Sequence, residues 1–115
     1  MFATIKSSTE VSRVFAQGKR LNAHSLTILV YENEEQHGQG GRVAFVAGKK
    51  FGNAVWRNRS KRRLREICRA LGGPWDGLDV VFMARRDTAD CPYRQLLADG
   101  KRLVRKAGLQ RGEEQ

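Results

Sequence analysis

The residues best suited to chemistry in this sequence are the lysines and arginines of residues 49–69, KKFGNAVWRNRSKRRLREICR. This segment holds nine basic side chains and one acidic side chain, Glu66, so it carries +8 of the chain's formal charge of +10. Guanidinium groups bind phosphate oxygens in pairs and also stack on bases. The segment therefore predicts a polyanionic partner, with a nucleic acid as the first candidate.

No side chains at recognisable spacing indicate hydrolysis by the protein itself. Paired carboxylates, a histidine beside an orienting acid, and a metal-ligand cluster are all missing from the sequence. Cys68 and Cys91 form no CxxC pair, and His24 and His37 do not complete a metal site with them. We therefore expect no catalytic residue, no metal site and no disulfide, with Cys68 packing as a small buried hydrophobe.

A helix from about residue 54 to residue 71 must position the basic side chains. Asn53 is a suitable N-cap, and the buried face is predicted from apolar residues at i, i+3, i+4 and i+7. These apolar residues are Leu64, Ile67, Cys68 and Leu71.

The same helical projection places the basic side chains on two surfaces. Arg57, Lys61 and Arg65 follow one another at four-residue intervals beside the apolar face. Arg59 and Arg63 project from the opposite flank. The projection predicts a basic ridge lining a groove between helix and sheet, and a second basic flank that faces solvent.

The other elements are predicted from hydrophobic period and turn residues. A capping box, Ser7 with Glu10, begins a helix that Gly18 ends at the C′ position. Strands are expected within 19–31, where a short edge strand precedes LTILVY, and at 42–48 and 78–84, the last buried on both sides. A mobile polar hairpin loop is predicted at 33–41, and a last amphipathic helix follows Asp90 and Pro92.

This order predicts an α+β two-layer domain, in which three helices pack on a mixed β-sheet of about four strands that includes a β-α-β crossover. At 115 residues the chain is a single domain, 1–115, with a core at about 5–107 and a polar tail at 108–115. No apolar run approaches the roughly 20 residues of a membrane span, and the N-terminus lacks a secretory signal. We expect a cytoplasmic protein.

Aromatic side chains near the basic residues could stack on unpaired bases, at about 1–3 kcal/mol for each base. The candidates are Phe15, Tyr31, Phe51 and Trp56. Packing in the core is the competing and stronger interpretation for each ring, and Phe15 is the best of the four candidates for stacking.

The run from Lys49 to Arg62, KKFGNAVWRNRSKR, resembles the bacterial ribonuclease P protein component. The family's motif is an RNR segment that follows KK-hydrophobic-GNAV and opens a basic helix. VFAQGKR is similar to the family's first helix and GLDVVFMARR to its last strand, so the resemblance spans about residues 5–107.

The resemblance implies a protein that joins a large catalytic RNA and assists endonucleolytic removal of the 5′ leader from precursor tRNA. The RNA subunit would perform the hydrolysis with Mg²⁺, no further protein partner would be required, and the crossover would be left-handed. Contacts with the RNA subunit would come from Lys49, Lys50, Arg57, Asn58, Arg59, Lys61, Arg62 and Arg65. Contacts with the single-stranded leader would come from Phe15, Thr27, Leu29, Val46, Gly48, Arg57, Lys61 and Arg65.

The basic helix allows three other interpretations. The first is a structural, ribosomal-type RNA-binding protein without a role in tRNA processing, against which the RNR run argues. The second is a DNA-binding protein, for which a dimerisation stripe or a helix-turn-helix is missing. The third is a membrane-surface helix, but the core needs its apolar stripe.

Overall fold

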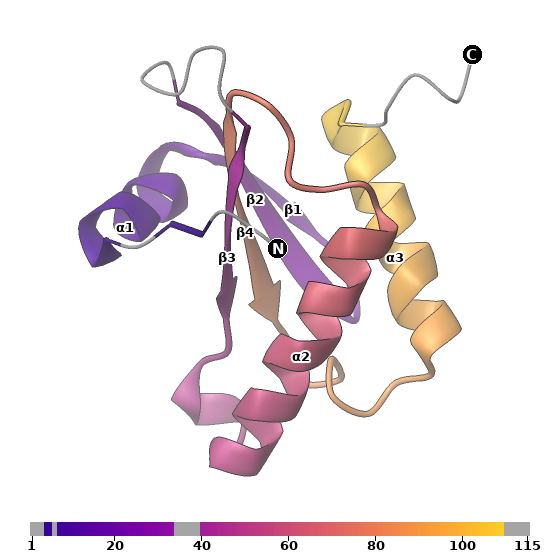
Figure 1. The fold of residues 1–115 in the computed structure, drawn as a ribbon. Coiled ribbons are helices and arrows are strands. Elements are labelled where there is room, and N and C mark those ends of the chain that lie inside the picture. The colour runs from indigo at the N-terminus through magenta and orange to yellow at the C-terminus, as the bar shows by residue number, and fades with distance from the viewer. Residues whose placement is uncertain (1–3, 6, 34–39, 110–115) are drawn as a thin grey trace.

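The computed structural model describes residues 4–5, 7–33 and 40–109, and Figure 1 shows its arrangement of helices and strands. The elements are α1 (Ser8–Gln17), β1 (Lys19–Asn22), β2 (Leu26–Glu32), β3 (Arg42–Val46), the 3₁₀ turn η2 (Lys49–Phe51), α2 (Ala54–Ala70), β4 (Leu78–Ala84) and α3 (Tyr93–Ala107). Within these residues no helix is long and apolar enough to cross a membrane. The predicted order of elements is confirmed.

The strands form one sheet in the order β1-β2-β4-β3. β2 is antiparallel to both β1 and β4, whereas β3 is parallel to β4. A parallel pair needs a crossover connection, and α2 supplies it between β3 and β4. The predicted mixed sheet with a β-α-β unit is confirmed.

Helices lie on both faces of the sheet. α2 and α3 pack side by side on one face, while α1 lies alone on the other (Figure 1). Since successive strand residues point to opposite faces, each strand contributes to two cores. Phe82 faces α2 and α3, and its neighbour Val81 faces α1.

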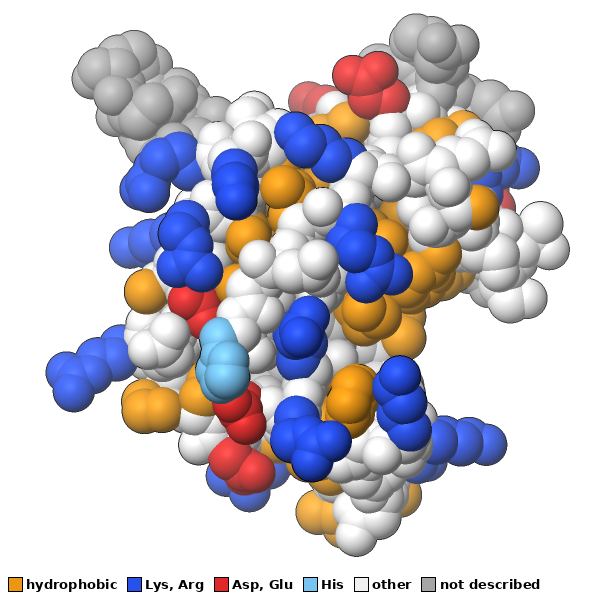
Figure 2. Space-filling view, turned by 180° about the vertical axis from the view of Figure 1, so that it is seen from behind, with side chains coloured by type: hydrophobic (Ala, Val, Ile, Leu, Met, Phe, Trp, Pro, Cys, Tyr) orange, Lys and Arg blue, Asp and Glu red, His pale blue; other side chains and the backbone are white. Residues whose placement is uncertain are grey.

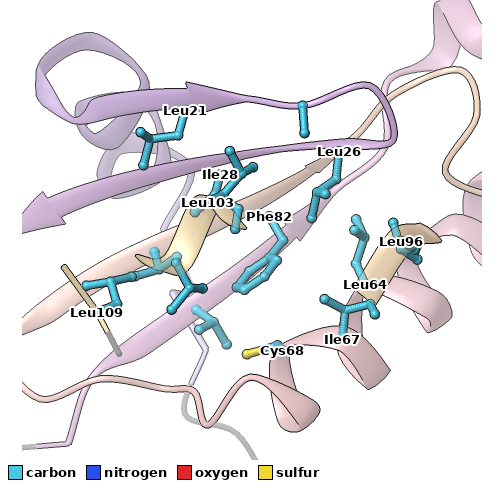
Figure 3. Close-up of a cluster of buried hydrophobic side chains, with 14 of the residues drawn as sticks. Leu21, Leu26, Ile28, Leu64, Ile67, Cys68, Phe82, Leu96, Leu103 and Leu109 are labelled. Atoms are coloured by element: carbon cyan, nitrogen blue, oxygen red, sulfur yellow. The ribbon is translucent and has the colours of Figure 1, made fainter. Parts of the chain in front are cut away.

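The larger core fills the space between the sheet and helices α2 and α3 (Figure 3). Phe82 lies at its centre, with ring centroids 5.7 Å from Phe45 and 6.3 Å from Trp75. The predicted α2 residues Leu64, Ile67 and Cys68 are fully buried there. Each such aliphatic or aromatic side chain contributes about 1.5–3 kcal/mol on burial, so this core fixes the position of α2.

The ends of α1 confirm the predicted N-cap at Ser7 and the predicted end of the helix at Gly18, but not the capping box. The Ser7 hydroxyl accepts hydrogen bonds from the backbone N–H groups of Thr9 (3.1 Å) and Glu10 (3.4 Å), as an N-cap should. The carboxylate of Glu10 binds Arg42 instead of completing a capping box. Gly18 follows the last residue of α1, as predicted, and has an ordinary φ of −77°. Glycine is needed there because a Cβ would lie 2.5 Å from the Val14 carbonyl oxygen.

A nearly buried ion-pair cluster fastens α1 to the sheet. Arg42 on β3 donates to Asp79 on β4 from Nε (3.0 Å) and Nη2 (2.8 Å), and to Glu10 on α1 from Nη1 (3.1 Å). Hydrogen bonding to Asp79 raises the pKa of Arg42 above its ordinary value, so the guanidinium stays charged. We call Glu10, Arg42 and Asp79 the Arg42 clasp.

The loop predicted at 33–41 connects β2 to β3, but the predicted hairpin is wrong because β4 lies between these two strands. The described ends of the loop are also packed against the protein. Asn33 is buried, and its side-chain amide donates to Asp79 at 2.8 Å. Gly41 is buried so closely against Trp75 that a Cβ would lie 1.8 Å from the Trp75 carbonyl oxygen. Residues 34–39, which include His37, lie outside the described residues, as do 110–115 of the predicted tail.

Candidate nucleic-acid interface

The basic ridge of α2 lies where the helical projection places it, along the β3 side of the helix. The Asn53 side chain caps the helix by accepting from the Trp56 N–H at 3.0 Å, which sets the helical register. Arg57 and Lys61 are half-buried against the core, and Arg65 is exposed with its guanidinium 5.6 Å from the centre of the Phe45 ring. Asn58 and Arg62 are exposed farther round the helix.

The opposite flank of α2 is not the free basic surface that the sequence predicts. Arg63 donates from Nη1 to the backbone carbonyls of Thr88 (2.9 Å) and Cys91 (2.7 Å). It therefore holds the 85–91 loop against α2. Arg59 lies 3.7 Å from Asp90, but both side chains are largely exposed, so this weak pair leaves Arg59 accessible to RNA.

We expect the Arg63→Met substitution to destabilise the fold by about 1–3 kcal/mol, because two carbonyls lose a charged donor while the packing of the stem is kept. Urea unfolding measures this loss. Affinity for RNA should change less than in an Arg62→Met variant, which removes the same charge from an exposed position. A stable Arg63→Met protein with strongly weakened RNA binding would contradict this structural role.

The turn η2 lies where the sequence predicted the end of a strand. The strand predicted to reach residue 48 ends at Val46, and exposed Lys49 and Lys50 lie in the turn. The Lys50 ammonium lies 5.2 Å from the centre of the Phe51 ring, and the Arg86 guanidinium lies 5.9 Å from it. The Phe51 ring also packs against Trp56, with 6.0 Å between the ring centroids. This packing confirms a role for Phe51 at the entry to α2.

A concavity of about 310 Å³ lies on the α1 face of the sheet, beyond the end of α1. Its apolar lining comes from the strands and from η2, and three cationic side chains surround it. The lining residues are Arg20, Val46, Gly48, Lys50, Phe51, Met83, Ala84 and Arg85. Seen from behind, the molecule exposes hydrophobic side chains among many Lys and Arg side chains (Figure 2). An apolar floor with a cationic rim suits an unpaired nucleic-acid strand.

The predicted leader-binding residues of the sheet differ in accessibility. Val46 and Gly48 line the concavity, and Phe15 is half-buried against the small core under α1, as Val46 and Met83 are. Leu29 is fully buried in that core, so it supports the floor and offers no surface to a ligand. Thr27 is also fully buried.

The hydroxyl of Thr27 belongs to a polar cluster at the edge of this face. It donates to the Asn22 side chain at 2.9 Å and accepts from Arg85 Nη1 at 3.3 Å. Thr27 therefore helps to orient Arg85, which lines the concavity.

The resemblance assigned both the α2 cations and the residues of the sheet and α1 to the leader, but the structure places these two groups on opposite faces of the sheet. Arg57, Lys61 and Arg65 belong to α2, which packs on the face of the sheet opposite α1 and the concavity (Figure 1). None of these three side chains lines the concavity, so the expected groove between the α2 ridge and the sheet stays a prediction.

Sequence reasoning missed four residues of this concavity, Arg20, Met83, Ala84 and Arg85. Strand register could have identified two of them. Arg20 pairs with Leu29, and Met83 pairs with Thr27 and with Val46, so these side chains share a face.

The two thiols show no sign of activation. Burial raises the pKa of Cys68 to about 12, and it also raises the pKa of Cys91 above its ordinary value. Both cysteines are therefore protonated at neutral pH. In the described part of the chain, no three His, Cys, Asp or Glu side chains come together as a group that could hold a metal ion.

Comparison with known proteins settles the family. The sequence matches the family described as Ribonuclease P over residues 2–108. The chain belongs to the ribonuclease P protein family. It is 36% identical over 104 residues to the ribonuclease P protein component of Finegoldia magna, covering 90% of this chain and 88% of that protein. It is 42% identical over 96 residues to the ribonuclease P protein component of Ruegeria pomeroyi, covering 79% of this chain and 75% of that protein.

Solved structures of ribonuclease P proteins share the fold of this chain. The ribonuclease P protein of Staphylococcus aureus superimposes with a TM-score of 0.79 at 22% identity, over 96% of this chain and all (100%) of that one. The ribonuclease P protein from Thermotoga maritima superimposes with a TM-score of 0.73 at 25% identity, over 90% of this chain and 96% of that one. The predicted role as the protein component of ribonuclease P, a bacterial tRNA-processing enzyme, is thereby confirmed.

Proposed function

We propose that this chain binds the catalytic RNA of ribonuclease P through α2 and the 5′ leader of precursor tRNA through the concavity on the α1 face. The observation that carries the proposal is that the protein has two surfaces of different chemistry, one on each side of the sheet. α2 presents charged side chains suited to phosphates, including the exposed Arg59 and Arg62. The concavity has apolar walls and a cationic rim, which suit the bases and phosphates of an unpaired strand.

In this proposal the RNA subunit performs the endonucleolytic hydrolysis. Mg²⁺ would be held by that RNA and by the substrate, and the protein would contribute no catalytic side chain. The protein neutralises phosphates with Lys50, Arg20 and Arg85 around the leader, which lowers the electrostatic cost of bringing two RNAs together. It would act in the cytoplasm and would need no further protein partner.

Cleavage of a precursor tRNA with a 5′ leader tests the proposal. A bacterial ribonuclease P RNA is assayed at low Mg²⁺, with and without this protein, and the protein is also assayed alone. We expect accurate 5′ cleavage only when RNA and protein are both present. Tight RNA binding without rescue of cleavage would instead favour a structural, ribosomal-type RNA-binding protein.

We expect the Phe15→Ala substitution to weaken affinity for leader-bearing precursor tRNA, by about 1–3 kcal/mol if the ring stacks on a base. Phe15 is half-buried and packs against the same small core as Val46, which lines the concavity, so its exposed part lies on the face of the sheet where the strand would bind. The measurement compares substrate affinity of the assembled enzyme with and without the leader. An equal loss for mature tRNA, or a large fall in the unfolding midpoint, would assign Phe15 to the core alone.

A further inference from the structure

Helix α3 carries a second concentration of positive charge, which the net charge of the sequence conceals. Residues outside 49–69 sum to +2, that is +10 less +8, because acidic residues elsewhere offset their basic ones. Within α3, however, five basic residues accompany one acidic residue, Asp99. All five basic residues are exposed: Arg94, Lys101, Arg102, Arg105 and Lys106.

Asp99 pairs with only one of these cations, Arg102, because its carboxylate is buried in the protein. It is 2% exposed and accepts hydrogen bonds from the Ser25 hydroxyl (2.7 Å), Gln95 (3.1 Å) and Arg102 (3.3 Å). Burial raises the pKa of Asp99, but the hydrogen bonds from Ser25 and Gln95 outweigh it and hold the pKa below its ordinary value. The carboxylate is therefore charged and already satisfied inside the fold.

Three of the α3 cations form a straight row on the outermost side of the helix. At 100° per residue, Arg94, Lys101 and Arg105 fall within about 40° of one another, opposite the buried Leu96 and Leu103. The helical rise separates them by about 10 Å and about 6 Å along the axis. In the described part of the chain, none of the three lies within ion-pair distance of a carboxylate.

The neighbouring helix α2 supplies a second row beside the first. Arg62 and Arg69 are exposed on its outer side. Between the two helices lies a shallow hollow of about 400 Å³, lined by Glu66, Arg69, Ala70 and Tyr93. We call this hollow, together with the two rows of cations beside it, the α2–α3 trough. The trough has cations on its α2 side and on its α3 side, and one carboxylate, Glu66, lines it.

We propose that the α2–α3 trough binds the sugar-phosphate backbone of a double-stranded RNA segment. A backbone needs only cations along its path, and the trough has two rows of them. An unpaired strand would need aromatic rings for its bases, and Tyr93, 41% exposed, is the one aromatic side chain lining the hollow. The identity of the RNA that supplies the duplex rests on the proposed function, under which it is the ribonuclease P RNA.

Charge substitutions of both signs test the trough, using an RNA duplex of about 16 base pairs and arbitrary sequence as the probe. We expect Lys101→Gln with Arg105→Gln to weaken binding and to flatten the log–log salt dependence by up to about 1.8 units, at 0.9 for each phosphate contact. Glu66→Gln should act in the opposite direction and tighten binding several-fold, because it removes the one carboxylate lining the hollow.

Matched controls remove the same charge from positions outside the trough. Lys19→Gln with Lys106→Gln also removes two cations: Lys19 is exposed on β1, and Lys106 projects about 120° round α3 from Arg94. Asp76→Asn removes an exposed carboxylate from the loop before β4. Both controls should leave the salt slope and the affinity close to those of the unsubstituted protein, and thermal melts confirm that every variant is folded.

Equal effects of trough and control variants would reduce the result to net charge and overturn the proposal. An unchanged salt slope in the Lys101/Arg105 variant would also overturn it, as would weaker binding by Glu66→Gln. These readouts do not depend on cleavage. A protein that fails to rescue cleavage but shows the predicted pattern with the duplex would lose the proposed function and keep the trough.

Discussion

Replacing Asp79 by alanine is expected to lower the free energy of unfolding by about 3 kcal/mol, the lower end of the range for breaking a buried ion pair. Arg42 would lose both of its hydrogen bonds to β4, and the Asn33 amide would lose an acceptor. The loss falls at the lower end because Arg42 is 17% exposed and keeps Glu10 as a partner. Since small domains have only about 5–15 kcal/mol of stability, urea unfolding should detect it easily.

Two further variants separate charge from packing in the Arg42 clasp. Asp79→Asn keeps the shape and one acceptor oxygen, so it should cost less than Asp79→Ala. Asp76→Ala removes an exposed carboxylate nearby and should stay within about 0.5 kcal/mol of the unsubstituted protein. If Asp79→Ala unfolded at the same urea concentration as Asp76→Ala, the clasp would make no net contribution to stability.

The second large effect is expected from replacing Arg57 and Arg59 together by alanine. Both project from the first turns of α2, and neither has a strong partner within the described protein: Arg57 is half-buried, and Arg59 has only its exposed pair with Asp90. Binding to a ribonuclease P RNA should weaken, and its log–log salt slope should flatten by up to about two units. Titration at several salt concentrations measures both quantities.

The fold should survive this double substitution, because alanine is the best helix former and the core residues of α2 are untouched. Lys19→Ala with Lys106→Ala is the control, since it removes the same charge from β1 and α3. Unchanged affinity and slope in the Arg57/Arg59 variant would show that the arginines of the RNR segment do not contact the RNA.

The helices and strands could be predicted because local chemistry defines them. Ser7 and Asn53 cap the first two helices as predicted, and the buried spacing of Leu64, Ile67 and Cys68 fixes the inner face of α2. Strand β4 reads as an almost continuous apolar run because helices cover both of its faces. These features depend on neighbours within one or two turns of the chain.

The sides on which the elements pack could not be predicted in this way. No local pattern says that α1 and α2 lie on opposite faces of the sheet, so Phe15 and Arg65 were expected beside one strand of RNA. Likewise, Arg63 reads as a free cation in the sequence, because its acceptors, the carbonyls of Thr88 and Cys91, carry no sequence signature. Contacts between residues far apart in the sequence decide both cases.

The opposite placement of the concavity and α2 has a consequence for how two RNAs would be held. If each RNA occupies one face of the same packed sheet, the first to bind fixes the second site close to it, and the second association becomes intramolecular. Effective concentrations for such linked sites reach the millimolar range, and the combined affinity can exceed either alone by roughly 10²–10⁴ without any new contact. A rigid four-stranded sheet preserves this gain better than a flexible linker would, because it fixes the separation of the two sites.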